Sequence, residues 1–475
     1  MVFSSPVFLF CFLPFCLLAY WAFGWRSRSF FLIVAGCIFY LAGSSSFLLL
    51  LLATIFCNYV IAKSIKRSEN NNRRAKSILF FGVFLNILSL FYWKYSGFAS
   101  KLLSDLIQML GGHDKYVLSV VLPIGISFYT FQCVSFLVDV YRKEIGSLPR
   151  FRNFAAFIFL FPHLIAGPIV RFKDIEHELT ERPVNRLEAF SYGAPRFFWG
   201  LAKKILIADQ ISLITDRVYS LPNNQLTFAV VWIGVVVYAL QIYFDFSGYS
   251  DMAIGLAQMF GFRFKENFNR PYSSHSLTDF WRRWHISLSS WFRDYLYVPL
   301  GGNRRSNPRT YFNLLIVFAL TGFWHGAQWT FLAWGLFHGV FLVLERLFRD
   351  KVKIGFFNPA LRRPLVFIVV CFGWAIFRAT SIDQAWAFVS TMIDPSSFTI
   401  PLFIKEVITN QRITWISVGL LVLLVPRNIQ IGLVLSESDS RKGTLFRVAV
   451  VSILAPLTCV YALTTTFSPF LYFQF

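Results

Sequence analysis

Two histidines lie in sequence contexts that suit proton transfer. His325 ends an apolar stretch in the segment TGFWHGA, residues 321–327, where small neighbours leave open space beside its ring. An imidazole with an ordinary pKa of about 6.5 matches general-base chemistry at neutral pH. A histidine that only forms hydrogen bonds across a helical hairpin fits the same local sequence. Both interpretations of His325 therefore stay open at this level.

His285 lies in residues 280–294, a segment dense in tryptophan and arginine. If the segment is one helix, a single face consists of Trp281, His285, Leu288 and Phe292. Such an aromatic and basic helix is typical of a membrane interface, where a histidine is usually structural. The alternative is that this helix lines the opening for an anionic cytoplasmic donor, with Arg282 and Arg283 binding that donor.

Two carboxylates, Asp245 and Asp251, lie among apolar residues in 243–251. Charged side chains are costly inside a membrane, so each needs a structural or functional reason. We expect Gly248 to bend the chain here, which puts both carboxylates at a hairpin turn. There they either accept hydrogen bonds from loop N–H groups and pair with arginine, or contact a substrate directly.

Sequence motifs of other catalytic classes are missing. The chain has no G-x-S-x-G nucleophile elbow, no P-loop and no H-E-x-x-H zinc motif. The seven cysteines all lie in apolar segments and form no C-x-x-C pair. That pattern is typical of small buried hydrophobic residues, not of a disulfide framework or a zinc site. We therefore expect no metal and no bound cofactor.

The composition identifies the environment in which these residues must work. Of 475 residues, 56% are hydrophobic and only 15% are charged, against roughly a quarter charged in ordinary globular proteins. Long uncharged stretches occur at residues 117–138 and 221–244. Stretches of this length are candidates for membrane spans. The sequence therefore predicts an all-α polytopic membrane protein rather than a soluble one.

The net charge of +21 follows from 45 Lys and Arg residues against 24 Asp and Glu residues. Because the basic residues gather in short loops between apolar blocks, the positive-inside rule and anionic lipid headgroups account for them, and we expect no nucleic acid partner. Residues 63–76 and 263–309 are predicted to face the cytoplasm. The N-terminal stretch reads as an uncleaved first span, so the N-terminus is predicted to face outward.

Counting along the chain gives about 11 transmembrane helices in one integral-membrane domain, residues 1–475. Residues 228–243 and 247–262 are expected to be two separate spans. Residues 154–170 do not fit a regular alternation of inner and outer loops, because basic residues flank both ends. Two prolines also interrupt the stretch. We interpret this stretch as a re-entrant or broken segment and residues 161–171 as a candidate wall of a buried cavity. An ordinary kinked span is the alternative.

Seven segments, in order, resemble the membrane-bound O-acyltransferase family in its bacterial polysaccharide branch. They are residues 2–5, 122–129, 161–171, 243–255, 280–289, 322–327 and 467–475. The resemblance implies a ring of helices around a central catalytic tunnel. It also implies that His325, in the Trp-His-Gly segment, is the catalytic histidine and that His285 is the second family position. Further candidates for binding substrate or donor are Trp324, Arg282, Arg283, Asp245 and Asp251.

The resemblance further implies an acetyltransferase of the bacterial inner membrane. It would pass acetyl groups from a cytoplasmic thioester donor, acetyl-CoA or an acyl carrier protein, to an exported polysaccharide such as alginate. Periplasmic acetyltransferase partners are expected to complete the transfer. The alternative is a transporter of polysaccharide or lipid-linked sugar, in which the same polar residues would line a conduit.

Overall fold

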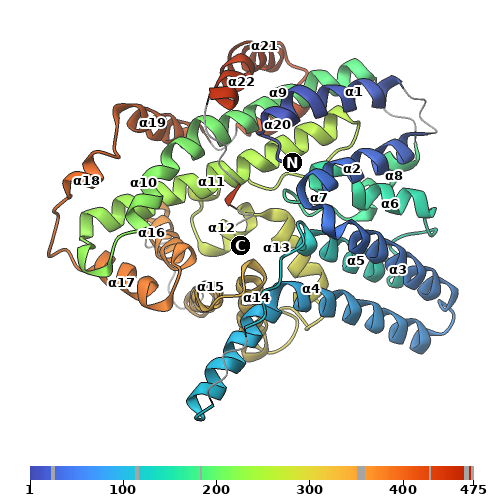
Figure 1. Cartoon of the computed structure of the whole chain (residues 1–475), viewed down its shortest axis with the longest axis horizontal. Coiled ribbons are helices and arrows are strands. Elements are labelled where there is room, and N and C mark those ends of the chain that lie inside the picture. The colour runs from blue at the N-terminus through green and yellow to red at the C-terminus, as the bar shows by residue number, and fades with distance from the viewer. Residues whose placement is uncertain are drawn as a thin grey trace. The chain divides into compact units, whose positions relative to one another are not determined.

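The computed structural model describes residues 1–22, 27–112, 117–181, 185–349, 359–426, 429–464 and 470–471. Throughout these ranges the regular structure is helical, without a strand (Figure 1), which confirms the predicted all-α class. The chain forms two compact units. Unit 1 comprises Met1–Gly193 and Ala253–Lys265, and unit 2 comprises Ala194–Met252 and Glu266–Phe475. The single domain expected from the sequence stays a prediction.

Unit 1 is built from the N-terminal helices. They are η1 (Phe8–Phe12), α1 (Leu13–Ala22), α2 (Arg28–Ser44), η3 (Ser45–Phe47), α3 (Leu48–Arg67), α4 (Asn72–Met109), α5 (Ile126–Tyr141), α6 (Phe151–Phe159), α7 (Phe161–Leu164) and α8 (Phe172–Thr180). Helices α9 (Arg186–Ala202) and α11 (Phe228–Met259) contribute residues to both units.

The predicted break in residues 154–170 is confirmed. Helix α6 ends at Phe159, the four-residue helix α7 follows, and the chain then runs to Arg171 without helical structure. Pro162 stands in the first turn of α7, where its missing N–H costs no helical hydrogen bond. Every residue of the stretch is buried. The re-entrant path, and the role of residues 161–171 as the wall of a cavity, stay predictions.

The predicted span over residues 117–138 is wrong in its first half, because helix α5 begins only at Ile126. Pro123 lies just before this start, and Gly125 at the N-cap has a left-handed backbone with φ +76°. A side chain at Gly125 would come within 2.6 Å of the Leu164 carbonyl oxygen. The Pro-Ile-Gly sequence therefore turns the chain into α5 and lets it pass close to α7.

Unit 2 contains the remaining helices. They are η4 (Lys203–Ala208), α10 (Asp209–Tyr219), η5 (Asn223–Gln225), η6 (Pro271–Ser273), α12 (Leu277–Arg283), α13 (Ile286–Phe292), η7 (Arg293–Tyr297), α14 (Asn307–His325), α15 (Trp329–Arg349), α16 (Pro359–Arg378), α17 (Ile382–Ile393), α18 (Leu402–Lys405), α19 (Asn410–Leu424), α20 (Ile431–Glu437), α21 (Arg441–Ala449), η9 (Val450–Leu454) and α22 (Ala455–Thr464).

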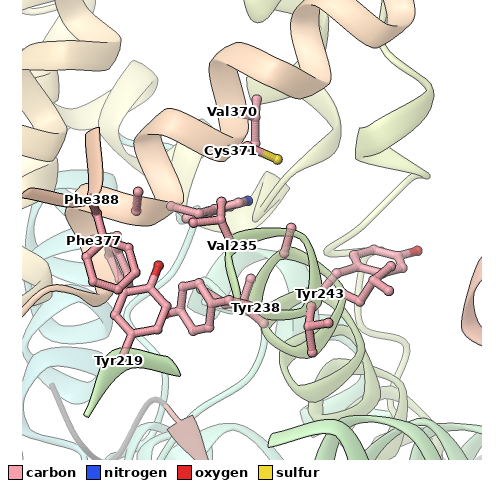
Figure 2. Close-up of a cluster of buried hydrophobic side chains, with 14 of the residues drawn as sticks. Tyr219, Val235, Tyr238, Tyr243, Val370, Cys371, Phe377 and Phe388 are labelled. Atoms are coloured by element: carbon pink, nitrogen blue, oxygen red, sulfur yellow. The ribbon is translucent and has the colours of Figure 1, made fainter. Parts of the chain in front are cut away.

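An aromatic core holds α10, α11, α16 and α17 together in unit 2 (Figure 2). Tyr219 at the end of α10 stacks on Phe388 of α17, with ring centroids 4.3 Å apart, and contacts Tyr238 of α11 at 5.9 Å. Phe377 of α16 belongs to the same core. Its ring also reaches His325, so the core supports the candidate site directly.

The predicted hairpin at Gly248 is wrong, because α11 is one continuous helix of 32 residues. Gly248 does not bend the chain but allows a close helix crossing. A Cβ at Gly248 would lie 2.8 Å from the carbonyl oxygen of Gly200 on α9, and one at Gly200 would lie 2.5 Å from that of Gly248. Small residues at a crossing let two membrane helices approach closely. Asp245 and Asp251 therefore lie inside a helix rather than at a turn.

Among the described residues, five helical stretches are long and apolar enough to cross a membrane: Arg28–Arg67, Asn72–Met109, Phe228–Met259, Trp329–Phe348 and Arg441–Thr464. Three shorter apolar helices accompany them. Helices α14 and α15 form a hairpin, and the two helices run beside each other in Figure 1. The number of 11 spans stays a prediction.

Candidate active site

His325 is the last residue of α14, and Gly326 follows it in an extended conformation. The imidazole packs edge-on against two aromatic rings, Trp334 of α15 at 5.1 Å and Phe377 of α16 at 5.2 Å. A Cβ at Gly326 would lie only 2.1 Å from the Phe331 ring, so the turn after His325 requires glycine. The site histidine is therefore fixed by both helices of the hairpin and by α16.

A small cavity opens beside His325 within unit 2. Its lining residues are Ile242, Asp245, Phe246, Trp284, His325, Trp334, Trp374, Phe377, Phe470 and Leu471. His325 and Asp245 are the titratable side chains of this lining, and the others are apolar or aromatic. The structure thus brings two of the predicted site residues to one small pocket with a mostly apolar lining.

Asp245 is buried and paired on both carboxylate oxygens. One oxygen lies 2.6 Å from the Lys204 ammonium of η4, and the other accepts a hydrogen bond from the Leu471 backbone N–H at 3.0 Å. Lys204 also contacts Asp209 at 2.7 Å. Burial alone opposes the charged form of Lys204, but the two carboxylates outweigh it and hold the Lys204 pKa above its ordinary value.

Asp251 forms a second buried ion cluster, six residues further along α11. Its carboxylate contacts Arg196 at 2.5 Å and Lys203 at 2.5 Å, and Arg196 also pairs with Glu266 at 2.7 Å. Both carboxylates have the buried basic partners that the structural interpretation requires, lysine as well as arginine. Direct contact of either carboxylate with a substrate stays a prediction. A short π-helix, η4, carries Lys203 and Lys204, and such wide helical turns occur often at functional sites.

The predicted single helix over residues 280–294 is wrong. It is divided into α12 and α13, and His285 lies between them with a left-handed backbone, φ 43° and ψ 56°. The backbone carbonyl of Asn267 accepts the Ile286 N–H at 2.9 Å, so a neighbouring loop replaces a helical hydrogen bond. The expected shared face of Trp281, His285, Leu288 and Phe292 therefore does not exist.

The Asn267 side chain fixes the His285 ring. Its Oδ1 accepts the Ser287 N–H at 3.2 Å and the Ser287 hydroxyl at 2.8 Å, and lies 3.1 Å from His285 Nδ1. Its Nδ2 donates to the Ser250 hydroxyl at 3.0 Å. Because Oδ1 can only accept, His285 donates from Nδ1 and keeps Nε2 as an acceptor. Burial lowers the pKa of His285 to about 3, so the ring is neutral at physiological pH.

Trp324 contacts both histidines. Its ring centroid is 5.0 Å from that of His325 and 6.4 Å from that of His285. His285 also packs edge-on against Phe246, which lines the cavity, at 4.6 Å. The structure therefore gathers His285, Trp324 and His325 into one continuous group of rings.

Arg282 and Arg283 point to different surroundings. Arg282 is exposed, whereas Arg283 pairs with Asp279 one turn earlier at 2.7 Å and donates to the Asn269 carbonyl at 3.3 Å. Neither arginine lines the cavity described above, although Trp284, the next residue, does. Their predicted role in binding a donor stays a prediction.

A family model for the membrane-bound O-acyltransferases matches residues 110–382, more than half of the chain. The chain belongs to the membrane-bound O-acyltransferase family. This confirms the family inferred from the seven segments, and the matched region contains the cavity residues from Ile242 to Phe377 as well as His285 and Trp324. The protein is thus an acyltransferase of a membrane family.

Curated relatives of this acyltransferase extend the match over the whole chain. It is 43% identical over 423 residues to a probable alginate O-acetylase of Pseudomonas aeruginosa, covering 89% of this chain and 80% of the relative. It is 40% identical to a probable alginate O-acetylase of Azotobacter vinelandii over the full length of both. A peptidoglycan O-acetyltransferase of Helicobacter pylori is 32% identical, covering 86% of this chain and 82% of the relative.

The arrangement around His325 in this acyltransferase suits proton transfer. In the described part of the chain, no group of three or more His, Cys, Asp or Glu side chains is placed to hold a metal ion. An imidazole beside an enclosed apolar space can take a proton from a hydroxyl while competing water is kept out. The expectation of no metal and no bound cofactor stays a prediction.

Sequence reasoning missed the partners that hold the site residues. Lys204, Arg196 and Asn267 contact the site residues from other helices or loops, and Leu471 reaches Asp245 from 226 positions away. The pair of lysines within the apolar stretch after residue 196 was a usable signal, because buried lysines need acidic partners. No local pattern identified Asn267 or Leu471.

Proposed function

We propose that this acyltransferase O-acetylates an exported polysaccharide, alginate or a related polymer, from the bacterial inner membrane. The observation that carries the proposal is the position of His325 at an enclosed aromatic cavity in a chain that aligns end to end with probable alginate O-acetylases. The peptidoglycan O-acetyltransferase relative supports acetyl transfer to a glycan more generally. A ring of helices around a catalytic tunnel would join the cytoplasmic donor to the outer acceptor.

In the proposed reaction His325 acts as the general base. A hydroxyl is a weak nucleophile at neutral pH, so a positioned base must remove its proton as the oxygen attacks the thioester carbonyl. The new C–O bond forms, the C–S bond breaks, and the imidazolium returns its proton to the leaving thiolate. The aromatic walls around His325 favour transfer over hydrolysis because they limit access of water.

In the proposed site, His285 accepts a hydrogen bond through its ring. Its ring is neutral, and Asn267 holds it with Nδ1 donating. Nε2 is then the nitrogen that accepts a hydrogen bond from an acceptor hydroxyl or from ordered solvent. Trp324 contacts both imidazoles, so a substrate group beside this indole would lie close to both.

The proposed donor is a cytoplasmic acetyl thioester, acetyl-CoA or an acetylated carrier protein. Both carry negative charge, and the exposed Arg282 lies in a predicted cytoplasmic segment that could attract them. A teichoic acid D-alanyltransferase of Streptococcus thermophilus is 30% identical over 250 residues, covering 48% of this chain, so the choice of acyl group differs within the family. Periplasmic acetyltransferases are the proposed partners that complete transfer to the polymer.

A deletion strain separates this proposal from the transporter alternative. Secreted polymer is quantified by mass, and its acetyl content by proton NMR. If the protein is an acetyltransferase, the deletion strain should secrete the polymer without acetyl groups. The wild-type gene should restore those acetyl groups. Loss of secretion, with normal acetylation of the polymer that remains in the cell, would instead identify an export component and refute the proposal.

A further inference from the structure

Two described residues near the C-terminus, Phe470 and Leu471, form part of the candidate cavity. Phe470 and Leu471 line it together with His325, and both are buried, with 0% and 7% of their surface exposed. Phe470 packs against two residues of α11, Tyr249 at 4.5 Å and Phe246 at 5.9 Å. Phe246 in turn contacts His285. The last two described residues therefore close one side of the site.

A single carboxylate connects these residues to the rest of unit 2. Asp245 accepts the Leu471 N–H on one oxygen and pairs with Lys204 on the other. The Lys204 ammonium stays charged because Asp209 supports it from the second side. A hydrogen bond to a charged acceptor is stronger than one between neutral groups, most of all where water is excluded. Asp251, with its own ion pairs, does not line the cavity in the described part of the chain.

We propose that Asp245, held by Lys204, is a positioning residue that anchors Phe470 and Leu471 as a wall of the His325 cavity. The anchored wall keeps water from the acyl donor. Without it, a water oxygen attacks the acetyl carbonyl, the C–S bond breaks, and acetate and free thiol are released without transfer. The anchoring stands on the contacts alone, whereas its effect on acyl transfer rests on the proposed function.

A matched pair of variants at the end of the chain tests the anchor with little risk to folding. Leu471→Pro removes the N–H donor and leaves Asp245, Lys204 and Asp209 unchanged. Leu471→Ala keeps the N–H and removes more apolar side chain than Leu471→Pro does, so lost side-chain packing cannot account for faster exchange in the proline variant. Hydrogen–deuterium exchange of the C-terminal peptide, followed by mass spectrometry in detergent, should be faster in Leu471→Pro than in Leu471→Ala. Equal exchange in the two variants would overturn the anchor, whatever the enzyme's substrate.

The second measurement compares acetate release with acetyl transfer for the same two variants, using acetyl-CoA as donor. The ratio of release to transfer should rise roughly tenfold in Leu471→Pro relative to Leu471→Ala, as expected for losing a hydrogen bond to a charged group. Faster exchange with an unchanged ratio would overturn the water-excluding role. If the wild-type protein neither transfers nor releases acetate from any thioester donor, the proposed function fails, and the exchange experiment still decides the anchor.

Discussion

Acid should destabilise this protein through protonation of His285, and comparison with a variant that lacks this histidine separates its effect from that of the other histidines. Burial lowers the pKa of this histidine from 6.5 to about 3 in the folded protein. Below pH 6.5 the unfolded chain binds a proton that the folded chain does not. The folded protein therefore has its full stability with respect to His285 above pH 6.5, and it loses stability as the pH falls toward 3.

The size of the effect at pH 5 follows from the unfolded pKa, because pH 5 still lies above the folded value. Each pH unit below 6.5 costs about 1.4 kcal/mol, so the loss at pH 5 is about 2 kcal/mol, or roughly 30-fold in the folded-to-unfolded ratio. The assay is denaturant unfolding in detergent micelles at pH 7.5 and pH 5. His285→Asn is the comparison, because asparagine tolerates the left-handed backbone at this position and does not titrate.

Between pH 7.5 and pH 5, the free energy of unfolding should fall by about 2 kcal/mol more in the wild type than in His285→Asn. The other histidines are common to both proteins and cancel in this difference. Equal losses would mean that the buried imidazole is not held neutral, and the description of its contact with Asn267 would be refuted.

Three further predictions concern packing, donor binding and topology. Gly248→Ala should destabilise the protein by about 1–3 kcal/mol, because its Cβ has no room at the helix crossing, and an unchanged unfolding midpoint would contradict that crossing. Arg282→Ala should weaken acetyl-CoA binding and lower the salt dependence of that binding. Arg283→Ala should change acetyl-CoA binding less, because Arg283 is already paired with Asp279. Equal effects of the two variants would contradict a special role of Arg282 in donor binding. Cysteines placed at Asn71 and Asn307 should resist labelling from outside the cell, and strong labelling of both would reverse the orientation.

The sequence predicted those parts of the fold whose causes are local. Proline residues marked the break in residues 154–170. Gly248 was misread because a glycine in an apolar helix fits either a bend or a close crossing, and only the position of Gly200 decides between them.

The sequence indicated which residues belong to the candidate site. It did not indicate which other residues hold them in place. His325 and His285 stand in recognisable motifs, yet the break at His285 depends on Asn267, 18 positions earlier. The burial of Asp245 is tolerable only because Lys204 and Leu471 meet it in three dimensions. Contacts between residues so far apart in the chain leave no periodic signal, so local reasoning could not supply them.

The most direct test of the account is the turnover of purified His325→Gln in proteoliposomes with an acetyl thioester donor. Glutamine keeps a hydrogen-bonding side chain but cannot accept the proton, so acetyl transfer should fall by at least ~10²-fold, the usual lower bound for general-base help. His177→Gln, at an exposed histidine, is the control for handling and abundance and should match wild type. Retention of more than about a tenth of wild-type turnover by His325→Gln would contradict the catalytic role of His325.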